Sequence, residues 1–326
     1  MQNILGIDVS KDTLDLKLIT EQGKSHKVID NKLEGFEILD KWLNSLHVDR
    51  LHVCLEATGQ YGDEVAEFLY IHGHDVSVVN PARIEHYGES KLHRNKTDKA
   101  DAALIAEFCL KEKPALWQPL SPELKHLRAL VRRLDDLKAI YQQENNRLSS
   151  GVKDEWVIDD LKVHLAYLKE RIDAAEAEIQ NFIDQTPSLK FQQSLLISIP
   201  GIGKKTSTIL LAEIGDINTF DNAPQLAAYA GLNPKGFSSG SSVHKKTRIS
   251  KQGRSELRNC LYLPAVVAMT HNPVVRSLRD RLFERRLPKM AIVAASMRKL
   301  LHIVYGVLKT QMPFDPEYHK QFNFSA

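Results

Sequence analysis

Four carboxylates in the first third of the sequence have the types and spacing of a metal site: Asp8, Glu56, Asp98 and Asp101. Asp8 lies near the end of the apolar run 4–9, and Glu56 directly follows another apolar run, so both acids are expected at strand ends. Asp98 and Asp101 are three residues apart in a predicted helix, which puts them on one face. Clustered carboxylates repel one another unless a cation or a proton offsets them, and oxygen ligands without His or Cys suit Mg²⁺ or Mn²⁺.

The elements that would position these acids alternate between strand and helix over residues 1 to about 112. Thr97 can cap the helix that carries Asp98 and Asp101. Strands are expected in a three-stranded meander and then singly, with helices between the later ones: strands near 4–9, 14–18, 27–29, 51–55 and 75–79, helices near 33–46 and 61–72. Acids after the first and fourth strands and on a late helix are typical of the RNase H-like α/β fold.

A helical region follows the break at Trp117 to Pro122. From Ile158 to Phe182, apolar residues recur at alternating spacings of 3 and 4, which is a heptad seam. The seam predicts a coiled-coil segment that ends at Thr186-Pro187. It either folds back on the preceding helix or pairs with another subunit, and the sequence leaves both alternatives open.

Charge is distributed unevenly along the chain. Residues 235–309 contain 16 Lys or Arg and three acids, a balance of +13, and because the whole chain carries +3, the remainder carries −10. A basic C-terminal region beside an acidic N-terminal one favours phosphate-backbone binding, although a solvated basic face is an equal alternative. Lys96 belongs to a basic stretch directly before Asp98, where it is well placed to grip a nucleic-acid strand or simply to lie in an exposed loop.

Other features bound the class of protein. Met1-Gln2-Asn3 has no basic n-region, and no apolar stretch is expected to span a membrane, so we expect a cytoplasmic protein. The three cysteines are far apart without a C-x-x-C, which argues against disulfides and structural zinc. The sequence contains no G-x-x-x-x-G-K-[ST], so it has no P-loop signature for ATP.

The stretch Pro200-Gly201-Ile202-Gly203-Lys204-Lys205 leads into an apolar helix. Its two glycines permit a tight turn, leaving amide N–H groups at a helix N-terminus to bind phosphate, with Lys204 and Lys205 beside them. The stretch resembles the helix-hairpin-helix motif, which binds DNA backbones without reading sequence. A simple connection between two helices is the alternative.

A polar stretch, 236–242, separates two helical blocks of the basic region and is rich in serine. A flexible linker is the default interpretation. A serine beside Lys, Arg and backbone amides can instead attack phosphorus, because those donors stabilise charge that develops on the phosphoryl oxygens. No general base for such a serine is identifiable from the sequence.

These pieces, in this order, resemble the D-E-D-D insertion-sequence transposases of the one-ten group, which are related to the pilin-gene invertases. The motifs are Gly-Ile-Asp8, Glu56-Ala-Thr-Gly, Asn-Lys-Thr-Asp98-Lys-Ala-Asp101, Ile-Pro-Gly-Ile-Gly, Ala-Gly-Leu-Asn-Pro and Ser239-Gly-Ser-Ser. The resemblance covers nearly the whole chain. It implies a RuvC-like RNase H-fold domain (1–116), a helical coiled-coil connector (117–187) and a mainly helical C-terminal transposase domain (188–326).

The resemblance also implies the chemistry. The serine directly before Gly-Ser-Ser, Ser239, would be the nucleophile of a covalent phosphoserine, with Ser241 and Ser242 left open as alternatives. The four acids would hold Mg²⁺, with Mn²⁺ possible. Recombination of donor and target DNA would be guided by a structured bridge RNA within a dimer or tetramer, in the cytoplasm of a prokaryote at its nucleoid. Residues expected to contact nucleic acid are Lys96, Gly201, Gly203, Lys204, Lys205, Lys245, Lys246, Arg248, Lys251 and Arg254.

Two other functions are compatible with the same residues. In a metal-dependent RuvC-like junction nuclease, the acids would cut DNA through an activated water and Ser239 would only bind phosphate. In a non-catalytic architectural protein, the turn at Gly201 and the basic helices would hold DNA without cutting it. The sequence also leaves open whether the acids and the serine of one reaction come from one subunit or from two.

Overall fold

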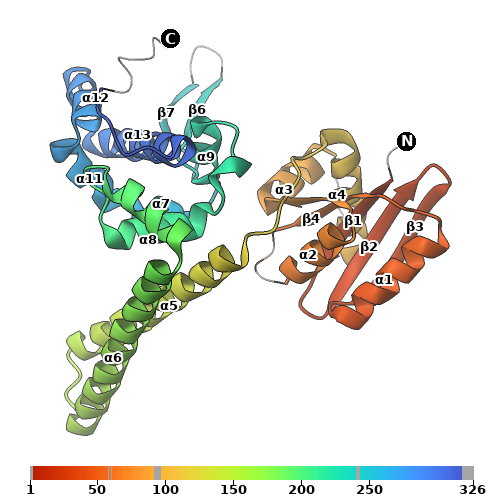
Figure 1. Ribbon diagram of the computed structural model, residues 1–326, viewed down its shortest axis with the longest axis horizontal. Helices are drawn as coiled ribbons and strands as arrows, with labels where there is room; N and C mark the ends of the chain where they lie inside the picture. The colour runs from red at the N-terminus through yellow and green to blue at the C-terminus, as the bar shows by residue number, and fades with distance from the viewer. Residues whose placement is uncertain (1–2, 58, 60, 92–96, 240–242, 318–326) are drawn as a thin grey trace. The chain divides into compact units, whose positions relative to one another are not determined.

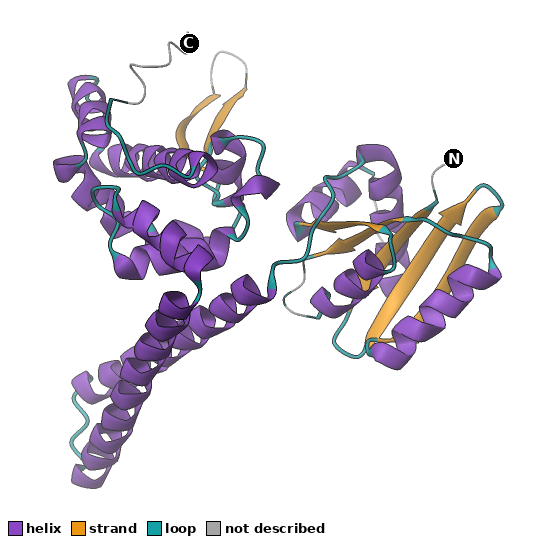
Figure 2. Cartoon of the chain, viewed as in Figure 1, coloured by secondary structure: helices purple, strands orange, loops and turns teal. Residues whose placement is uncertain are grey.

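The computed structural model describes residues 3–317 except 58, 60, 92–96 and 240–242, and the side chains of 237–247 lie outside the description. The chain forms two compact units, Met1–Pro119 and Leu120–Ala326. The first unit is a mixed α/β structure and the second is mainly helical (Figures 1 and 2). The helices predicted as a connector within 117–187 belong to the second unit, and their status as a separate region stays a prediction.

A five-stranded sheet organises the first unit, in the order β3-β2-β1-β4-β5. The strands are β1 (Ile4–Val9), β2 (Thr13–Thr20), β3 (Gly23–Asp30), β4 (His52–Glu56) and β5 (Asp75–Val79). The first three strands pair antiparallel as the predicted meander, whereas β4 pairs parallel with β1 and with β5. This is the strand order of the RNase H-like fold, as predicted.

Helices cover both faces of this sheet (Figure 1). Leu5, Ile7 and Val9 of β1 point to one face, where they pack with residues of α1 (Leu33–Ser45) and α2 (Asp63–Ile71). The alternate residues of β1 point to the opposite face, because side chains alternate along a strand. That second face is covered by α3 (Pro81–Ser90) and α4 (Asp98–Glu112).

The sequence analysis does not predict α3, although its start carries two ordinary signals. Asn80 caps the helix by accepting a hydrogen bond from the backbone N–H of Ala82 at 2.9 Å, and Pro81 occupies the first helical position. Asn at the N-cap followed by Pro is a common helix start. The helix contributes Ile84 to the core beneath α4.

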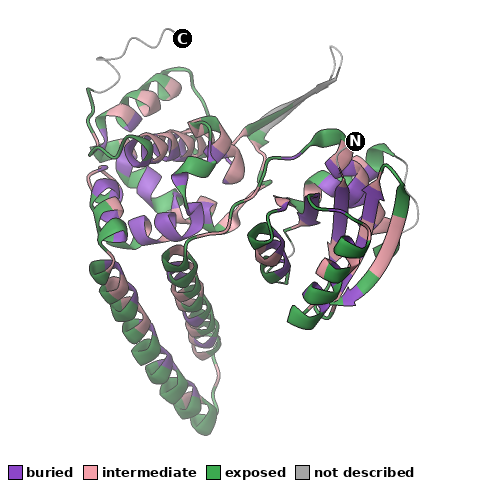
Figure 3. Cartoon of the chain, turned by 45° about the vertical axis from the view of Figure 1, so that its right-hand side comes forward, coloured by how far each residue is buried: buried purple, intermediate pink, exposed green. Residues whose placement is uncertain are grey.

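The second unit begins with two long helices, α5 (Pro122–Ser149) and α6 (Glu155–Gln185), which form a hairpin (Figure 1). The predicted heptad seam of α6 packs within the chain: Leu168 and Ile172 lie against Leu137 of α5 in one apolar cluster. Figure 3 shows that the rest of this hairpin is largely exposed. The first of the two alternatives for the seam, folding back on the preceding helix, is therefore realised in this structure.

The remaining helices enclose one large core. They are α7 (Pro187–Ile197), α8 (Lys204–Ile214), α9 (Ala223–Tyr229), α10 (Ser255–Cys260), α11 (Tyr262–His271), α12 (Pro273–Glu284) and α13 (Lys289–Thr310), with a short 3-10 turn at Ile217–Thr219. Leu300, Leu301 and Val304 of α13 are completely buried in this core. The core is therefore built around α13.

The expectation that no apolar stretch is long enough to span a membrane is wrong for α13. Its 22 residues have a mean hydropathy of 1.5 in their most apolar window, which is sufficient by length and composition. Half of that window is buried inside the second unit. A core helix of a globular domain meets the same criterion, since its apolar residues pack against other helices instead of lipid.

Candidate active site

The sheet places Asp8 and Glu56 at one edge of the first unit. Asp8 is the fifth residue of β1, and Glu56 is the last residue of β4. The parallel register pairs Ile7 with Leu55, so one further step along both strands brings Asp8 beside Glu56. Their side chains point to the same face, because neighbouring residues in register share a face. The prediction of acids at two strand ends is confirmed at the level of the backbone.

A glycine brings α4 onto this face at unusually short range. A Cβ atom at Gly6 would lie 2.4 Å from both the carbonyl oxygen of Ala102 and the backbone nitrogen of Ala106. Only glycine fits, because any side chain would collide with the helix backbone. Gly6 and Asp8 are two residues apart on β1 and share a face, so the close approach also brings the start of α4 toward Asp8.

The start of α4 carries the other two predicted acids. Thr97 is the N-cap, and its hydroxyl accepts a hydrogen bond from the backbone N–H of Ala100 at 3.3 Å, as predicted. Asp98 and Asp101 both lie in the first turn. Acids are favourable at this position because the amide dipoles give a helix N-terminus partial positive charge.

The electrostatics of Asp8 show that three of the four acids interact. The pKa of Asp8 is raised from 3.8 to about 6, first by burial and then by the charges of Asp101, Asp98 and Asp15. A raised carboxylate pKa means that burial and the nearby negative charges disfavour the ionised form. Glu56 is placed beside Asp8 by the register of β1 and β4.

These acids fit a divalent cation by their chemistry. All are oxygen donors, and the repulsion that raises the pKa of Asp8 is what a cation would relieve. As arranged, the described residues include no group of three or more His, Cys, Asp or Glu close enough to hold a metal ion. The backbone therefore brings the predicted acids toward one place, and their side chains would have to converge further to coordinate a metal ion.

Asp15 is a fifth acid at this place, and the sequence analysis does not identify it. It lies directly opposite Asp8 in the antiparallel pair of β1 and β2, with its side chain 12% exposed. Its carboxylate is held at 2.9 Å by the imidazole Nε2 of His26 on β3. The signal was available: in Leu14-Asp15-Leu16 the alternation puts Asp15 on the polar face of the meander, next to β1.

In the second unit, the predicted phosphate-binding turn lies between α7 and α8. Gly201 has φ +106°, and a Cβ there would lie 2.9 Å from the carbonyl oxygen of Pro264 on α11. Both the left-handed backbone and the close packing require glycine. Gly203 is the N-cap of α8, where no side chain caps the helix and a Cβ would meet nothing within 4 Å. The N-terminus of α8 is thus open to an anion.

The two lysines after this turn have different surroundings. Both are exposed at the start of α8. Lys205 Nζ lies 3.0 Å from a carboxylate oxygen of Glu176 on α6, which also pairs with Lys138. The charge of Lys204 contributes to lowering the pKa of Asp184, after larger effects from Gln180 and Lys190. Lys205 is thus already paired with an acid of α6.

The serine-rich stretch is part of a β-hairpin, not a loop between helices. β6 (Pro234–Ser239) and β7 (Val243–Ile249) pair antiparallel as a two-stranded sheet, with Ser239 opposite Val243. The sequence analysis misses these strands because β6 contains Pro, Gly and Ser, which have low strand propensity. Ser239 is the last residue of β6; its side chain, with those of Lys245 and Lys246, lies outside the described residues.

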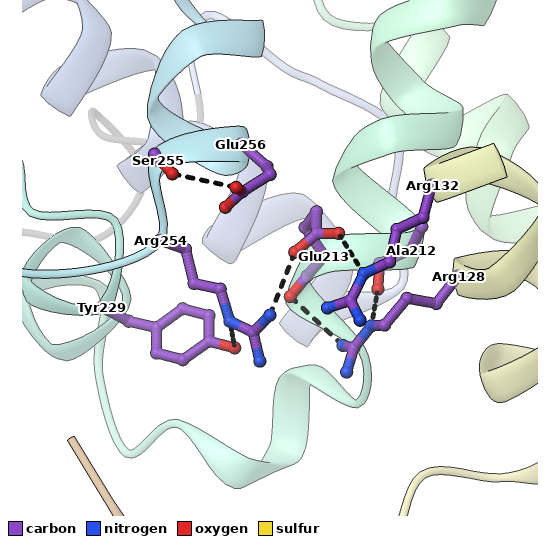
Figure 4. A network of polar contacts seen from close by, with 8 residues as sticks. All are labelled: Arg128, Arg132, Ala212, Glu213, Tyr229, Arg254, Ser255 and Glu256. Atoms are coloured by element: carbon purple, nitrogen blue, oxygen red, sulfur yellow. Dashed lines mark hydrogen bonds and ion pairs between the residues drawn. The ribbon is translucent and has the colours of Figure 1, made fainter. Parts of the chain in front are cut away.

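The remaining predicted nucleic-acid residues have diverse positions. Arg248 and Lys251 are exposed after the hairpin's tip, whereas Lys96 is outside the described residues. Arg254 is directed inward: its Nε donates to the hydroxyl of Tyr229 at 2.8 Å, and its guanidinium pairs with Glu213 at 3.5 Å (Figure 4). The nucleic-acid contact predicted for Arg254 stays a prediction.

The first unit therefore has the architecture of an enzyme that processes polynucleotides with a divalent metal: an RNase H-like sheet whose acids meet the acids of a facing helix. Comparison with known proteins agrees and is more specific. Residues 5–155 match a family described as "Transposase", of the DEDD IS110 type, and residues 193–279 match the "Transposase IS116/IS110/IS902 family".

Two individual relatives align with nearly the whole chain. The "Pilin gene-inverting protein" of Moraxella lacunata is 38% identical over 97% of this chain and 98% of its own length. The "Transposase for insertion sequence element IS1111A" of Coxiella burnetii is 26% identical over 94% of this chain and 90% of its own. The chain belongs to this IS110-type family of DNA transposases and recombinases. Its substrate is DNA, and its bacterial relatives imply a cytoplasmic enzyme.

A solved structure of RuvC from T. thermophilus, "in complex with Holliday junction substrate", is also similar. It is 13% identical, covers 36% of this chain and 99% of its own, and has a TM-score of 0.26. The RNase H-like assignment rests on the strand order and on the family match, and not on this likeness.

Proposed function

We propose that this transposase cuts and rejoins DNA by transesterification at Ser239. The serine Oγ attacks a phosphorus of the DNA backbone, a phosphoserine ester forms, and the P–O bond to the leaving strand breaks. The serine's proton passes to the leaving oxygen, which becomes a free hydroxyl. The number of phosphoester bonds is unchanged, so the reaction needs no ATP.

Asp8, Glu56, Asp98 and Asp101 bind Mg²⁺, or Mn²⁺, in this proposal. The observation that supports it is the electrostatic interaction of Asp8 with Asp101 and Asp98: burial is the largest cause of the rise in the pKa of Asp8 to about 6, and the charges of these two acids add to it. When bound, the metal stabilises charge on the transferring phosphate and on the leaving oxygen. Asp15, held by His26, adds negative charge beside Asp8 and favours cation binding at the same place.

The second unit binds the DNA backbone. The open N-terminus of α8 after Gly203, with Lys204 and Lys205 beside it, functions as a helix-hairpin-helix. Lys96, Lys245, Lys246, Arg248 and Lys251 add positive charge for phosphate. A structured bridge RNA pairs with donor and target DNA and so supplies the sequence specificity, which explains why the protein sequence has no base-reading motif. The active assembly is a homo-oligomer, a dimer or a tetramer, at the nucleoid.

The test is trapping of a covalent protein–DNA adduct. Wild-type protein, its RNA, Mg²⁺ and DNA carrying the element ends are denatured at intervals and separated on a gel. The adduct is expected for wild type and for Ser238→Ala, and is expected to be absent for Ser239→Ala. An adduct that persists in Ser239→Ala overturns the nucleophile assignment. Cleavage without any adduct in wild type favours the metal-dependent nuclease instead.

Mixing subunits tests how the residues are shared. Asp8→Ala and Ser239→Ala proteins are each expected to be inactive. Restored strand exchange in the mixture shows that acids and serine act across subunits, whereas inactivity at every ratio shows that both must be intact in one chain. Omitting the RNA tests guidance, because strand exchange that continues without RNA contradicts it.

A further inference from the structure

The hairpin that carries Ser239 is connected to the second unit through its base. In the part of the chain that the structure describes, its strands form a sheet of two. Below the last strand pair, the backbone N–H of Ser250 donates to the carbonyl of Asn233 at 2.8 Å, and that of Lys251 donates to the carbonyl of Gly231 at 3.1 Å. The segments entering β6 and leaving β7 thus continue side by side to the body of the unit.

Two glycines allow these segments to come very close. Gly231 has φ +67° and Gly253 has φ +153°. A Cβ at Gly253 would lie 2.3 Å from the carbonyl oxygen of Tyr229, and one at Gly231 would lie 3.0 Å from the backbone carbon of Lys251. The base is therefore a tightly packed junction, and its orientation sets the orientation of the hairpin.

Arg254 links this junction to the interior. Its backbone N–H donates to the carbonyl of Tyr229 at 2.8 Å, while its side-chain Nε donates to the hydroxyl of the same tyrosine at 2.8 Å. The guanidinium also lies over the Tyr229 ring, 5.6 Å from its centroid. Arg254, on the segment that follows β7, thus binds Tyr229, on the segment that precedes β6, through both its main chain and its side chain.

Glu213 is the interior partner of Arg254 (Figure 4). It lies near the end of α8, is 1% exposed, and pairs with Arg254 at 3.5 Å and with Arg132 of α5 at 3.9 Å. Within the described residues its Oε2 has no hydrogen bond, and the guanidinium of Arg254 is the ion-pair partner of that oxygen. Such burial costs stability, and a carboxylate kept there is best explained by what it orients.

From these contacts we infer that Glu213 is a positioning residue, which through Arg254 fixes the base of the β6–β7 hairpin, and thereby Ser239, against α8. This inference rests on the proposed role of Ser239. The same helix, α8, begins at the proposed phosphate-binding turn after Gly203 and carries Glu213 in its last turn, one residue before its end at Ile214. The ion pair therefore holds the nucleophile's hairpin in fixed relation to the helix that grips the DNA backbone.

Hydrogen exchange on the full-length protein tests the positioning directly. In Glu213→Gln, which removes the charge at nearly constant volume, amide exchange is expected to be about tenfold faster in peptides of β6 and β7. Peptides of α11 and α13 should be unchanged, whereas general destabilisation would accelerate them too. Glu284→Gln is the control, because it makes the same change at an exposed carboxylate, the last residue of α12.

The adduct assay adds a second, functional measurement. Glu213→Gln is expected to slow adduct formation about tenfold while DNA affinity stays within about twofold, and Glu213→Asp is expected to recover part of the rate. If hairpin exchange in Glu213→Gln equals that of wild type, the inference is overturned whatever the adduct shows. If wild type forms no adduct but hairpin exchange responds, the role of Ser239 fails and the positioning of the hairpin stands.

A second variant covers the case in which Glu213→Gln does not fold. Arg254→Lys keeps the positive charge but cannot reach Tyr229 and Glu213 together in the same geometry, because lysine lacks the planar fork. It is expected to accelerate exchange in β6 and β7 as Glu213→Gln would. Unchanged exchange in Arg254→Lys contradicts the inference equally.

Discussion

The acidic site of the first unit and the serine hairpin of the second are positioned by opposite means. Asp8 and Glu56 are placed by the register of a central parallel strand pair, and Gly6 brings the acids of α4 onto the same face. Ser239 lies at the end of a strand in a two-stranded sheet held by its base. The comparison indicates that the proposed metal ligands depend on the core of the fold, whereas the proposed nucleophile depends on a few polar contacts.

The largest effect is expected from the acidic site itself. Asp8→Asn removes a ligand and is expected to reduce strand cleavage by about a thousandfold, since metal-assisted charge stabilisation is lost. Rates are measured with saturating Mg²⁺ and compared with Asp12→Asn, which changes an exposed acid in the neighbouring turn. A cleavage rate in Asp8→Asn within a few-fold of the control would refute the assignment of the acids.

Two glycine substitutions, one beside the acidic site and one in the serine hairpin, compare how tightly the two regions are packed. Gly6→Ala is expected to destabilise the first unit by about 3 kcal/mol, because its Cβ would lie 2.4 Å from backbone atoms of α4. Gly236→Ala in β6 meets nothing within 4 Å and is expected to change stability by less than about 0.5 kcal/mol. Urea unfolding of the full chain, with hydrogen exchange to identify the unit affected, measures both. Equal effects would contradict the comparison.

DNA affinity should depend on the lysines at the start of α8. Lys204→Ala is expected to weaken DNA affinity several-fold and to reduce the slope of log K against log salt by about 1, because one phosphate contact is lost. Lys190→Ala, which removes an exposed lysine paired with Asp184 at 3.1 Å, is the control. Fluorescence anisotropy across a salt series measures the slope. An unchanged slope for Lys204→Ala would exclude a phosphate contact at this lysine.

A smaller effect is expected on the pH dependence of stability. The pKa of Asp8 in the folded chain is about 6, above its ordinary 3.8, chiefly because of burial. The folded state therefore binds the proton more tightly, and stability without metal falls as pH rises from about 4 to about 6. With allowance for solvent screening at this half-buried carboxylate, the loss is about 1 kcal/mol. In urea titrations with a chelator present, Asp8→Asn should not show this loss. Identical pH profiles for wild type and Asp8→Asn would contradict the raised pKa of Asp8.

The order of elements in the first unit was predictable because local patterns and core packing agree there. An apolar run predicted β1, alternation predicted β2, and Thr97 followed by spaced acids predicted the start of α4. The long-range features were not predictable. Neither the proximity of Asp15 to Asp8 nor the need for glycine at position 6 can be seen before the register and the helix position are known.

The second unit was harder for a physical reason. The strands of the hairpin have low intrinsic propensity, and they are held by contacts between residues about 20 apart, such as Arg254 with Tyr229. Arg254 was predicted to contact nucleic acid, and in the structure its side chain contacts a tyrosine and a buried glutamate. A charge count shows that a region is basic, but it does not show which lysine and arginine side chains form ion pairs inside the protein.

The most direct measurement of the central claim is mass spectrometry of the trapped adduct. After nuclease and protease digestion, the peptide spanning 236–245 should carry the residual nucleotide, and fragmentation should place it on Ser239. Modification of Ser241 or Ser242 instead would move the nucleophile within the same hairpin. Absence of any modified serine, with DNA cut by the wild-type enzyme, would contradict the phosphoserine mechanism.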